Sequence, residues 1–529
     1  MADERAKKIL KKFDKVKAGR VNWEDRWRDV GKYVMPRKDN VWDSLIVPGG
    51  EEKRVRLYDS SAEHFNVLLA SALSTMLINP TRQWYQLTTD DPVLNNNNEV
   101  REWLQKTAKA GQQILNNTNF HTQAHEMFLD LGGFGTAPLR MEEDDETVLR
   151  FKSEPIYELW VQENHKGEVD GIYKKFKMTV RQAKQRYGED IFDANERMSI
   201  AQDETKELHF LKVVLPSKEV EGSKTSKAFV SLELLCENGR ERILKEGGFN
   251  EFPYAVPRWN KTSYEMYGRS PSLTAMPDIK MINAMMQDTI RAAQKATTPP
   301  MMIPDDMMGS PVNTTPGGLN PYRAGTSDRI FPLETGSRPD IGLEFMRDIR
   351  ERIKAVYFID QLQLREGPQM TATEVNQRVD ESLRLLGPVL ARLHSEFLNP
   401  VIKRLTAVMK RKKLLPSLPA ILEDVEIEVI YNSQIAGAQK LAEANNFNRF
   451  VGSIAPLIQI NPGVIDNFDL DKASLELARL HGVNEEILRD QTETDALREQ
   501  RQQTQEQEQE MLNQAQQAET LNKLSQAVS

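Results

Sequence analysis

The N-terminal part of the chain carries apolar side chains at the three- and four-residue intervals of helices. Ile9, Phe13 and Trp27 share one face of a run that starts near Ala2 and ends at Pro36. This spacing predicts a single amphipathic helix. The same periodicity predicts three more helices, over residues 60–77, 97–116 and 121–131.

Local signals mark two ends of these helices. Ser60 precedes the second helix and Glu63 follows three residues later, which is the pattern of a capping box. The fourth helix leads into GGFGTAP, residues 132–138. This run has neither the register of a dinucleotide-binding loop nor that of a Walker loop, and a strand pattern follows it. We therefore predict a helix C-cap and a tight turn.

After Gly132 the pattern changes to an alternation of apolar and polar residues. The segments TVLRFKSEP, YELWVQEN, GIYKKFKMT, KELHFLKVVLP and AFVSLELLCEN alternate in this way between turn signals. Such alternation predicts antiparallel strands with one solvated face. The segment TVRQAKQRYG is predicted to be a short helix among them. Residues 1 to about 260 therefore indicate a mixed α+β unit.

Two long helical stretches follow, separated by a segment of different character. Ser270 and Pro271 suit the N-cap and first position of a helix, and Pro277 is expected to kink or restart it. The return helix is predicted over residues 341–362. The segment between the two is rich in Pro, Gly, Thr and Asn. A structureless insertion of about forty residues is usually functional.

The C-terminal part is again helical. Thr371 and Glu374 form a second capping-box pattern at the start of a region that runs to about Lys412. A Gly-Pro pair at 387–388 and an Asn-Pro pair at 399–400 are expected to bend or break it. The segment VEIEVIY predicts a strand. The Gln-rich end is polar on all sides and suits a surface helix, a bundle with few apolar contacts, or disorder.

Composition narrows the class of protein. A chain of 529 residues exceeds the size of one hydrophobic core, so three or more structural units are expected. No apolar run approaches the ~20 residues of a membrane span, and the N-terminus is charged, unlike a secretion signal. Cys236 is the sole cysteine, which suits a reducing compartment such as a cytoplasm. The net charge of -8 argues against tight nucleic-acid binding.

Few residues indicate catalysis or metal binding. His121 and His125 are four apart on a predicted helix, but no third ligand stands out, so surface or packing histidines are the favoured interpretation. The acidic run MEEDDE lacks the spacing of a calcium loop and suits a solvated hairpin turn. No nucleophile-elbow or kinase pattern is present. We therefore expect no enzyme activity, no cofactor and no metal site.

Several segments resemble, in the same order, the head-to-tail connecting (portal) proteins of T7-like short-tailed bacteriophages. They are RLYDSSAEHFNVLLASALSTMLINPTRQWYQLTTDD, LGGFGTAPLRMEED, GIYKKFKMTVRQAKQRYG, YGRSPSLTAMPDIKMINAMMQDTIRAAQKATTPPMMIPDD and MTATEVNQRVDESLRLLGPVLARLHSEFLNPVIKRL. The resemblance covers residues 5 to about 435 and leaves out the Gln-rich C-terminus.

The resemblance implies a structural protein that forms a dodecameric ring at one capsid vertex. Double-stranded DNA would pass through its central channel during packaging and ejection. The implied partners are terminase during packaging, then tail adaptor and tail proteins, with capsid, scaffolding and internal core proteins, transient non-specific DNA, and no membrane. The implied location is the virion, after assembly in the bacterial host cytoplasm. The alternative is another ring-forming virion component such as a tail adaptor, and a DNA-processing enzyme ranks third.

The expected fold class is α+β, mainly helical, with the wing, stem, clip and crown regions of portal proteins. By resemblance these regions are the N-terminal wing 1–269, the first stem helix 270–297, the clip 298–340, the second stem helix 341–360, the tunnel loop 361–370, a long wing helix with a strand 371–433, and the crown with a helical tail 434–529.

Three sets of candidate site residues follow from the resemblance. Stem cations suit transient contacts with DNA phosphates, with salt bridges or solvated faces as an equally weighted alternative: Lys280, Arg291, Lys295, Arg347, Arg350 and Lys354. The tunnel loop suits a mobile, weakly interacting lip, with an ordinary surface loop as the alternative: Gln361, Gln363, Arg365, Gly367, Pro368 and Gln369. The clip suits partner docking or strand addition to a neighbouring subunit: Pro299, Pro300, Met301, Met302, Ile303, Met307 and Met308.

Overall fold

The chain forms two units in its computed structural model. Unit 1 comprises Met1–Arg82 and Gln113–Lys412, and unit 2 comprises Gln83–Gln112 and Lys413–Ser529. The structure describes residues 4–41, 57–91, 94–188, 205–236, 241–302, 313, 331–332, 339–362, 385–422, 427–431, 447–454, 456, 463, 467–480, 494–507 and 511.

Unit 1 begins with two helices, α1 (Glu4–Ala18) and α2 (Val21–Tyr33). The prediction of one continuous helix was wrong. Arg20, at the break, is 2% exposed, and its guanidinium donates hydrogen bonds of 2.6–3.0 Å to three carbonyl groups within residues 156–159. The apolar periodicity continues across the break, but Gly19, directly after α1, is a local signal of a helix end that the prediction overlooked.

A five-stranded antiparallel sheet occupies the next part of unit 1, in the order β4-β5-β6-β7-β8. It confirms four of the five predicted strands and adds β8, which was not predicted; the fifth, TVLRFKSEP, forms β3 of a second sheet. α6 (Val180–Tyr187) confirms the short helix, which starts at a capping box on Thr179. The strands are β4 (Leu159–Glu163), β5 (Val169–Thr179), β6 (Glu207–Pro216), β7 (Phe229–Leu235) and β8 (Arg242–Phe249).

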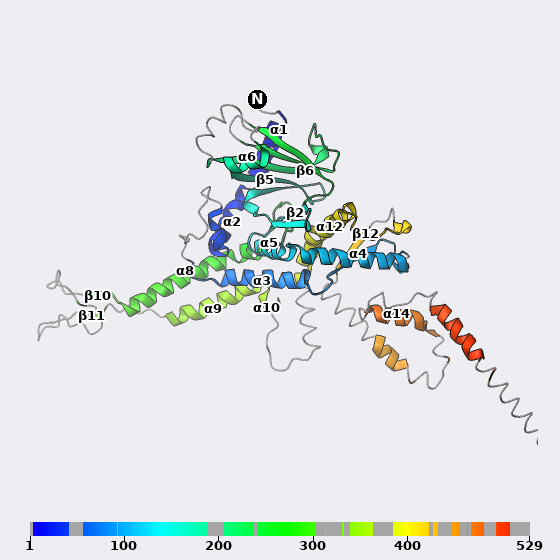
Figure 1. Cartoon of the computed structure of the whole chain (residues 1–529). Coiled ribbons are helices and arrows are strands. Elements are labelled where there is room, and N and C mark those ends of the chain that lie inside the picture. Colours follow the sequence, from blue (N-terminus) through cyan, green and yellow to red (C-terminus); the bar gives the residue numbers. More distant parts are fainter. Residues whose placement is uncertain are drawn as a thin grey trace, which may run out of the picture. The chain divides into compact units, whose positions relative to one another are not determined.

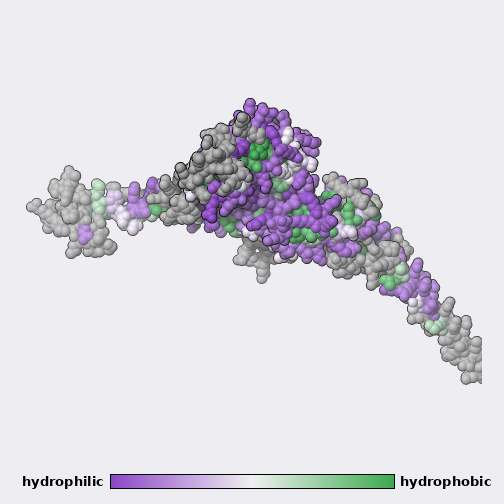
Figure 2. Space-filling model, turned by 45° about the horizontal axis from the view of Figure 1, so that its top comes forward, coloured by the Kyte–Doolittle hydropathy of each residue, from purple (hydrophilic) through white to green (hydrophobic). Residues whose placement is uncertain are grey.

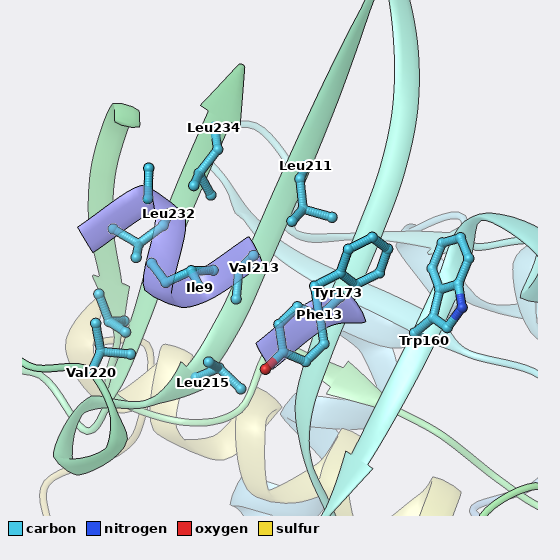
Figure 3. Close-up of a cluster of buried hydrophobic side chains, with 12 residues drawn as sticks. Ile9, Phe13, Trp160, Tyr173, Leu211, Val213, Leu215, Val220, Leu232 and Leu234 are labelled. Carbon is cyan, nitrogen blue, oxygen red and sulfur yellow. The ribbon is translucent and has the colours of Figure 1, made fainter. Parts of the chain in front are cut away.

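One face of this sheet is covered by α1. Ile9 and Phe13 pack against apolar residues of β5, β6 and β7, including Tyr173 and Leu211 (Figure 3). The Phe13 ring meets Trp160 edge-on, with 5.0 Å between ring centroids. Burying such side chains is the main favourable term in folding, which explains the helical period of α1.

The opposite face of the sheet is less solvated than predicted. Residues 208 and 210–215 of β6 are buried, so both faces of this strand are covered. Lys212 lies on this second face between Glu142 and Glu233, each 3.7 Å from its Nζ. Leu208 and Phe210 of the same face pack with Val180 and Ala183 of α6. Apolar contacts and buried ion pairs therefore take the place of water.

A smaller sheet has the order β3-β2-β9. Its strands are β2 (Leu139–Asp144), β3 (Val148–Ser153) and β9 (Tyr254–Ala255). The acidic run MEEDDE forms the turn of the β2–β3 hairpin, where Asp144 pairs with Val148 and its carboxylate accepts the Thr147 N–H at 3.0 Å. The hairpin prediction is confirmed.

Helices α3 (Ser61–Leu77), α4 (Asn98–Asn117) and α5 (Phe120–Phe134) confirm the other three helices predicted in the N-terminal part. The predicted capping box at the start of α3 was wrong, because a different side chain accepts the hydrogen bond at this helix end. Ser60 is at the N-cap position, but its side chain makes no capping hydrogen bond. The Asp59 carboxylate accepts the Ser61 N–H instead, at 3.0 Å.

The long C-terminal helix of unit 1 is not broken by its Gly-Pro or Asn-Pro pair. Residues 385–393 are helical, His394–Leu398 form one π-helical turn, and α12 (Asn399–Arg411) follows directly. The Asn399 N–H bonds to the carbonyl of His394, one residue further back than in an α-helix. Pro400 has no N–H to donate, and the widened turn accommodates it without a break. The capping box at Thr371 lies outside the described residues.

Unit 2 contains a two-stranded antiparallel sheet of β1 (Tyr85–Thr89) and β12 (Ile427–Tyr431). β12 is the strand predicted from VEIEVIY. Its helices include α14 (Leu470–Leu480) and an exposed helix over residues 494–507. That part of the Gln-rich region is therefore a surface helix.

The described elements agree with the predicted α+β, mainly helical class. No helix among the described residues is long and apolar enough to cross a bilayer. The face shown in Figure 2 is mainly hydrophilic, with scattered apolar patches.

Candidate functional site

The candidate site is a pair of long helices in unit 1 and the strands beyond them. α8 (Pro271–Thr297) and α9 (Pro339–Val356) lie side by side, and β10 (Met301–Met302) pairs with β11 (Phe331–Pro332) past the end of α8 (Figure 1). Arg352 of α9 pairs with Asp278 near the start of α8, at 3.4 Å. The two helices are therefore antiparallel.

Two details of this pair differ from the predictions. α8 is one helix that contains Pro277, so this residue does not restart it. The return helix ends at Val356 and not at residue 362, because Phe358 has a φ of +59°, and the short α10 (Ile359–Leu362) follows. A left-handed residue cannot continue a right-handed helix.

The start of α8 is fixed to the end of α5. As predicted, Ser270 is the N-cap and Pro271 the first helical residue, and the Ser270 hydroxyl accepts the Leu273 N–H at 3.0 Å. The same hydroxyl donates to the Gly133 carbonyl at 2.6 Å, and the Ser272 hydroxyl donates to the Gly132 carbonyl at 2.7 Å. The last carbonyl groups of α5, which lack partners within their own helix, are thus satisfied by side chains from α8.

Two glycines allow the backbones to meet at this point. The C-cap predicted within residues 132–138 is Gly135, with a φ of +82°, and α5 continues to Phe134, three residues past its predicted end. A Cβ at Gly135 would lie 2.3 Å from the Gly268 carbonyl oxygen, and a Cβ at Gly268 would lie 2.3 Å from the Gly135 carbonyl oxygen. We call residues 132–135 together with 268–272 the α5–α8 junction.

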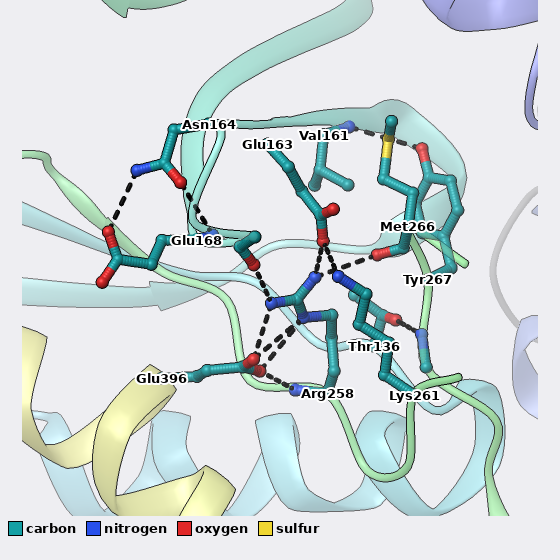
Figure 4. Close-up of polar contacts among 12 residues, drawn as sticks. Thr136, Val161, Glu163, Asn164, Glu168, Arg258, Lys261, Met266, Tyr267 and Glu396 are labelled. Atoms are coloured by element: carbon teal, nitrogen blue, oxygen red, sulfur yellow. Dashed lines mark hydrogen bonds and ion pairs between the residues drawn. The ribbon is translucent and has the colours of Figure 1, made fainter. Parts of the chain in front are cut away.

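A buried ion network holds the loop before this junction (Figure 4). Arg258 is 1% exposed, and its guanidinium binds the Glu396 carboxylate at 2.6 Å and also that of Glu163. Burial disfavours its charge, but hydrogen bonds and the charges of Glu396 and Glu163 outweigh this and raise the pKa of Arg258. Glu396 lies in the π-helical turn. The Arg258 side chain therefore links the long C-terminal helix to the loop that precedes α8.

The stem cations fall into two groups. Lys280 pairs with Asp29 at 2.6 Å, Arg350 with the buried Asp59 at 2.7 Å, and Lys354 with Asp360 at 2.6 Å. Arg291 lies 3.9 Å from Asp288, and both are exposed. Lys295 and Arg347 are exposed and make no ion pair within the part of the chain that the structure describes.

Only some of the clip and tunnel-loop candidates are among the residues that the structure describes. Pro299 and Pro300 follow α8, and Met301 and Met302 are 37% and 46% exposed in β10. Gln361 lies in α10. The other candidates lie outside the described residues: Ile303, Met307, Met308, Gln363, Arg365, Gly367, Pro368 and Gln369.

One histidine of the pair on α5 is partly buried and hydrogen-bonded to a neighbouring side chain. His121 is hydrogen-bonded to the Asn116 side chain at 2.9 Å, and burial lowers the pKa of its imidazole. Among the residues that the structure describes, no three His, Cys, Asp or Glu side chains are grouped to hold a metal ion.

Sequence reasoning missed Arg258 and Glu396. They are 138 residues apart, and neither belongs to a recognisable motif. The Asn-Pro pair at 399–400 was the one available signal, because it marked an irregularity in the helix that carries Glu396.

Comparison with known proteins identifies the family. The family model described as "Bacteriophage head to tail connecting protein" matches residues 6–488. The portal protein of Salmonella phage epsilon15 is 28% identical over 504 residues, which cover 93% of this chain and 90% of that protein. The probable portal protein of Bordetella phage BPP-1 is 28% identical over 502 residues, covering 92% and 90%.

Among solved structures, a chain of the virion of a native gene transfer agent particle aligns with a TM-score of 0.37 and 9% identity, over 74% of this chain and 86% of that one. The family match extends over most of the sequence and agrees with the resemblance noted from its segments. The chain belongs to the family of bacteriophage head to tail connecting proteins.

Proposed function

We propose that this chain is the repeating subunit of a portal ring, dodecameric in the virion, through which double-stranded DNA is packaged and ejected. The observation that carries the proposal is the family match over residues 6–488. Both curated relatives are named portal proteins, which favours this function over the tail-adaptor alternative.

The helix pair has the properties that a stem in such a ring requires. A closed ring is held by contacts between two different faces of each subunit. The buried residues of α8 all lie within its first half, up to Asn283, and Ile290 further along is 38% exposed. Leu343 and Phe345 of α9 are 49% and 50% exposed. We assign these apolar residues to contacts with neighbouring subunits.

The ion pairs refine the assignment of channel cations. Lys280, Arg350 and Lys354 already bind carboxylates of their own unit, so contact with DNA would break an existing pair. Lys295 and Arg347 are free of such pairs within the described part of the chain and are our first candidates for phosphate contacts. Few free cations suit a channel in which DNA slides, because each neutralised phosphate raises affinity steeply.

The exposed β10 strand is proposed to dock terminase during packaging and tail proteins afterwards. Methionine side chains are flexible and fit successive partners of different shape. Met301 and Met302 pair with β11 of their own chain and still expose a large fraction of their surface.

Replacing Met301 and Met302 together by serine is expected to leave the rings intact and to reduce phage yield about tenfold or more, since a loss of 1.4 kcal/mol in docking is a factor of ten. The measurement is complementation of a phage whose own portal gene is disrupted, with DNA-filled heads counted by electron microscopy. The matched control replaces two other exposed apolar residues, Val21 and Val67, by serine. They are 56% and 42% exposed, and this variant should complement fully.

Loss of the rings themselves in the Met301→Ser, Met302→Ser protein would contradict docking, because β10 would then hold subunits together. Normal yield would show that β10 does not bind a partner. Failure of the wild-type gene to restore DNA-filled heads would overturn the packaging function.

A further inference from the structure

Residues from the three-stranded sheet, the five-stranded sheet and α6 of unit 1 line a cavity of about 270 Å³. Five of its eight lining residues are cationic and one, Glu158, is acidic. The cations come from five elements: Arg140 from β2, Lys152 from β3, Lys174 from β5, Lys212 from β6 and Arg186 from α6.

Among these cations, Lys212 is the one that is buried without a hydrogen bond from its ammonium group to any described residue. It is 8% exposed, yet its Nζ makes no hydrogen bond within the described part of the chain, and its nearest carboxylate oxygens, of Glu142 and Glu233, are 3.7 Å away. Lys174 lies directly opposite on β5, so two like charges face each other across the strands. Burial, with the charge of Arg140, lowers the pKa of Lys212.

The nearby carboxylates are already committed to other groups. Glu154 binds Lys174 and lies 3.0 Å from the Arg140 Nε. Glu233 accepts a hydrogen bond of 2.8 Å from Arg186 and one of 2.6 Å from the Tyr187 hydroxyl. A buried ammonium without a hydrogen bond is costly, and no described acid can move to Lys212 without releasing another cation.

We propose that this cavity binds a small free tetrahedral oxyanion with the chemistry of phosphate, held by Lys212 together with Arg140, Lys174 and the more exposed Lys152 and Arg186. Such an ion gives Lys212 its missing charge-assisted hydrogen bond. Because the cations belong to both sheets, the bound ion also links the β2–β3 hairpin to the larger sheet. This site is separate from the stem and independent of the portal function.

The test is isothermal titration of the purified full-length protein with inorganic phosphate at constant ionic strength, with sodium chloride as the reference salt. The wild type is expected to bind phosphate with a measurable enthalpy. The Lys212→Met variant is expected to bind at least about tenfold more weakly, since it loses a charge-assisted hydrogen bond. Absence of phosphate binding by the wild type would overturn the proposal.

Two further variants keep the test decisive if Lys212→Met fails to fold. Lys152→Met removes an exposed cation of the cavity and should weaken phosphate binding about threefold or more. Lys175→Met, the matched control, removes an exposed lysine of β5 whose side chain points to the other face of the sheet, and should stay within about twofold of the wild type. Equal affinities of Lys152→Met and Lys175→Met would contradict the site.

A short DNA duplex distinguishes a free anion from the phosphodiester backbone. Added in excess, the duplex should leave phosphate binding to the wild type unchanged, because the lining residues surround a space suited to a small ion. Competition by the duplex would overturn the assignment to a free oxyanion.

Discussion

Replacing Arg258 by methionine is expected to destabilise unit 1 by about 3–5 kcal/mol, the range measured when one partner of a buried ion pair is removed. Arg258 is 1% exposed and binds both Glu396 and Glu163. Its loss leaves Lys261 as the other cationic partner of Glu163 and Arg392 as that of Glu396 within the described part of the chain. It also removes the guanidinium's hydrogen bonds to the Met266 and Gly167 carbonyl groups. Urea unfolding followed by tryptophan fluorescence, at a fixed protein concentration, measures the change.

Two control variants distinguish the effect of losing the ion network from the effect of losing a positive charge in general. Arg28 pairs with Asp25 at 2.9 Å, but both side chains are well exposed, so Arg28→Met should cost within about 0.5 kcal/mol. The double replacement of Arg258 and Glu396 by methionine should cost less than the sum of the single changes, because it also removes the orphaned acid. A loss below about 1 kcal/mol for Arg258→Met would mean that the network does not hold the loop before α8.

Replacing Gly135 by alanine is expected to destabilise unit 1 by about 2–5 kcal/mol. An alanine there has to adopt a φ of +82°, and its Cβ would meet the Gly268 carbonyl oxygen at 2.3 Å and the Ser270 N at 2.7 Å. The conformation costs about 1–2 kcal/mol and the overlap with backbone atoms adds about 1–3 kcal/mol. Because Ser270 caps α8, we also expect the helix pair to lose its fixed position. Thermal unfolding and limited proteolysis within residues 271–297 measure the two effects.

Two other glycines serve as matched controls. Gly188 has a φ of +85° and a ψ of 173°, a conformation largely confined to glycine, but open space around its Cβ position. Gly188→Ala should therefore cost only the conformational part, about 1–3 kcal/mol. Gly342 lies inside α9, and a Cβ there would meet only the Thr289 hydroxyl at 3.6 Å, so Gly342→Ala should stabilise by about 0.5–1 kcal/mol. Equal effects at Gly135 and Gly188 would show that the close approach of the two backbones is unimportant.

Local features of the fold were predictable from the sequence because their causes are local. Ser270 and Pro271 start α8, and Gly135 ends α5, through interactions within a few residues. Four of the five strands of the larger sheet followed from alternation alone, and β8 was missed. The family followed from segments that occur in the same order as in its other members.

The features that sequence reasoning missed depend on contacts between distant segments. The break between α1 and α2 coincides with the buried Arg20, whose partners lie more than a hundred residues away. The role of Arg258 depends on Glu396, and the second face of β6 is buried by contacts with α6 and by the pairing of Lys212 with Glu142 of β2. No local pattern encodes these pairings, so they appear only in the folded chain.

The central claim is that this chain forms a ring around a DNA channel. The most direct measurement is electron microscopy of the purified full-length protein, with class averages viewed along the symmetry axis. The account predicts closed rings with a central opening wide enough for a DNA duplex and with about twelve repeats, as the family resemblance implies. Monomers, open filaments, or closed particles without a central opening would contradict it.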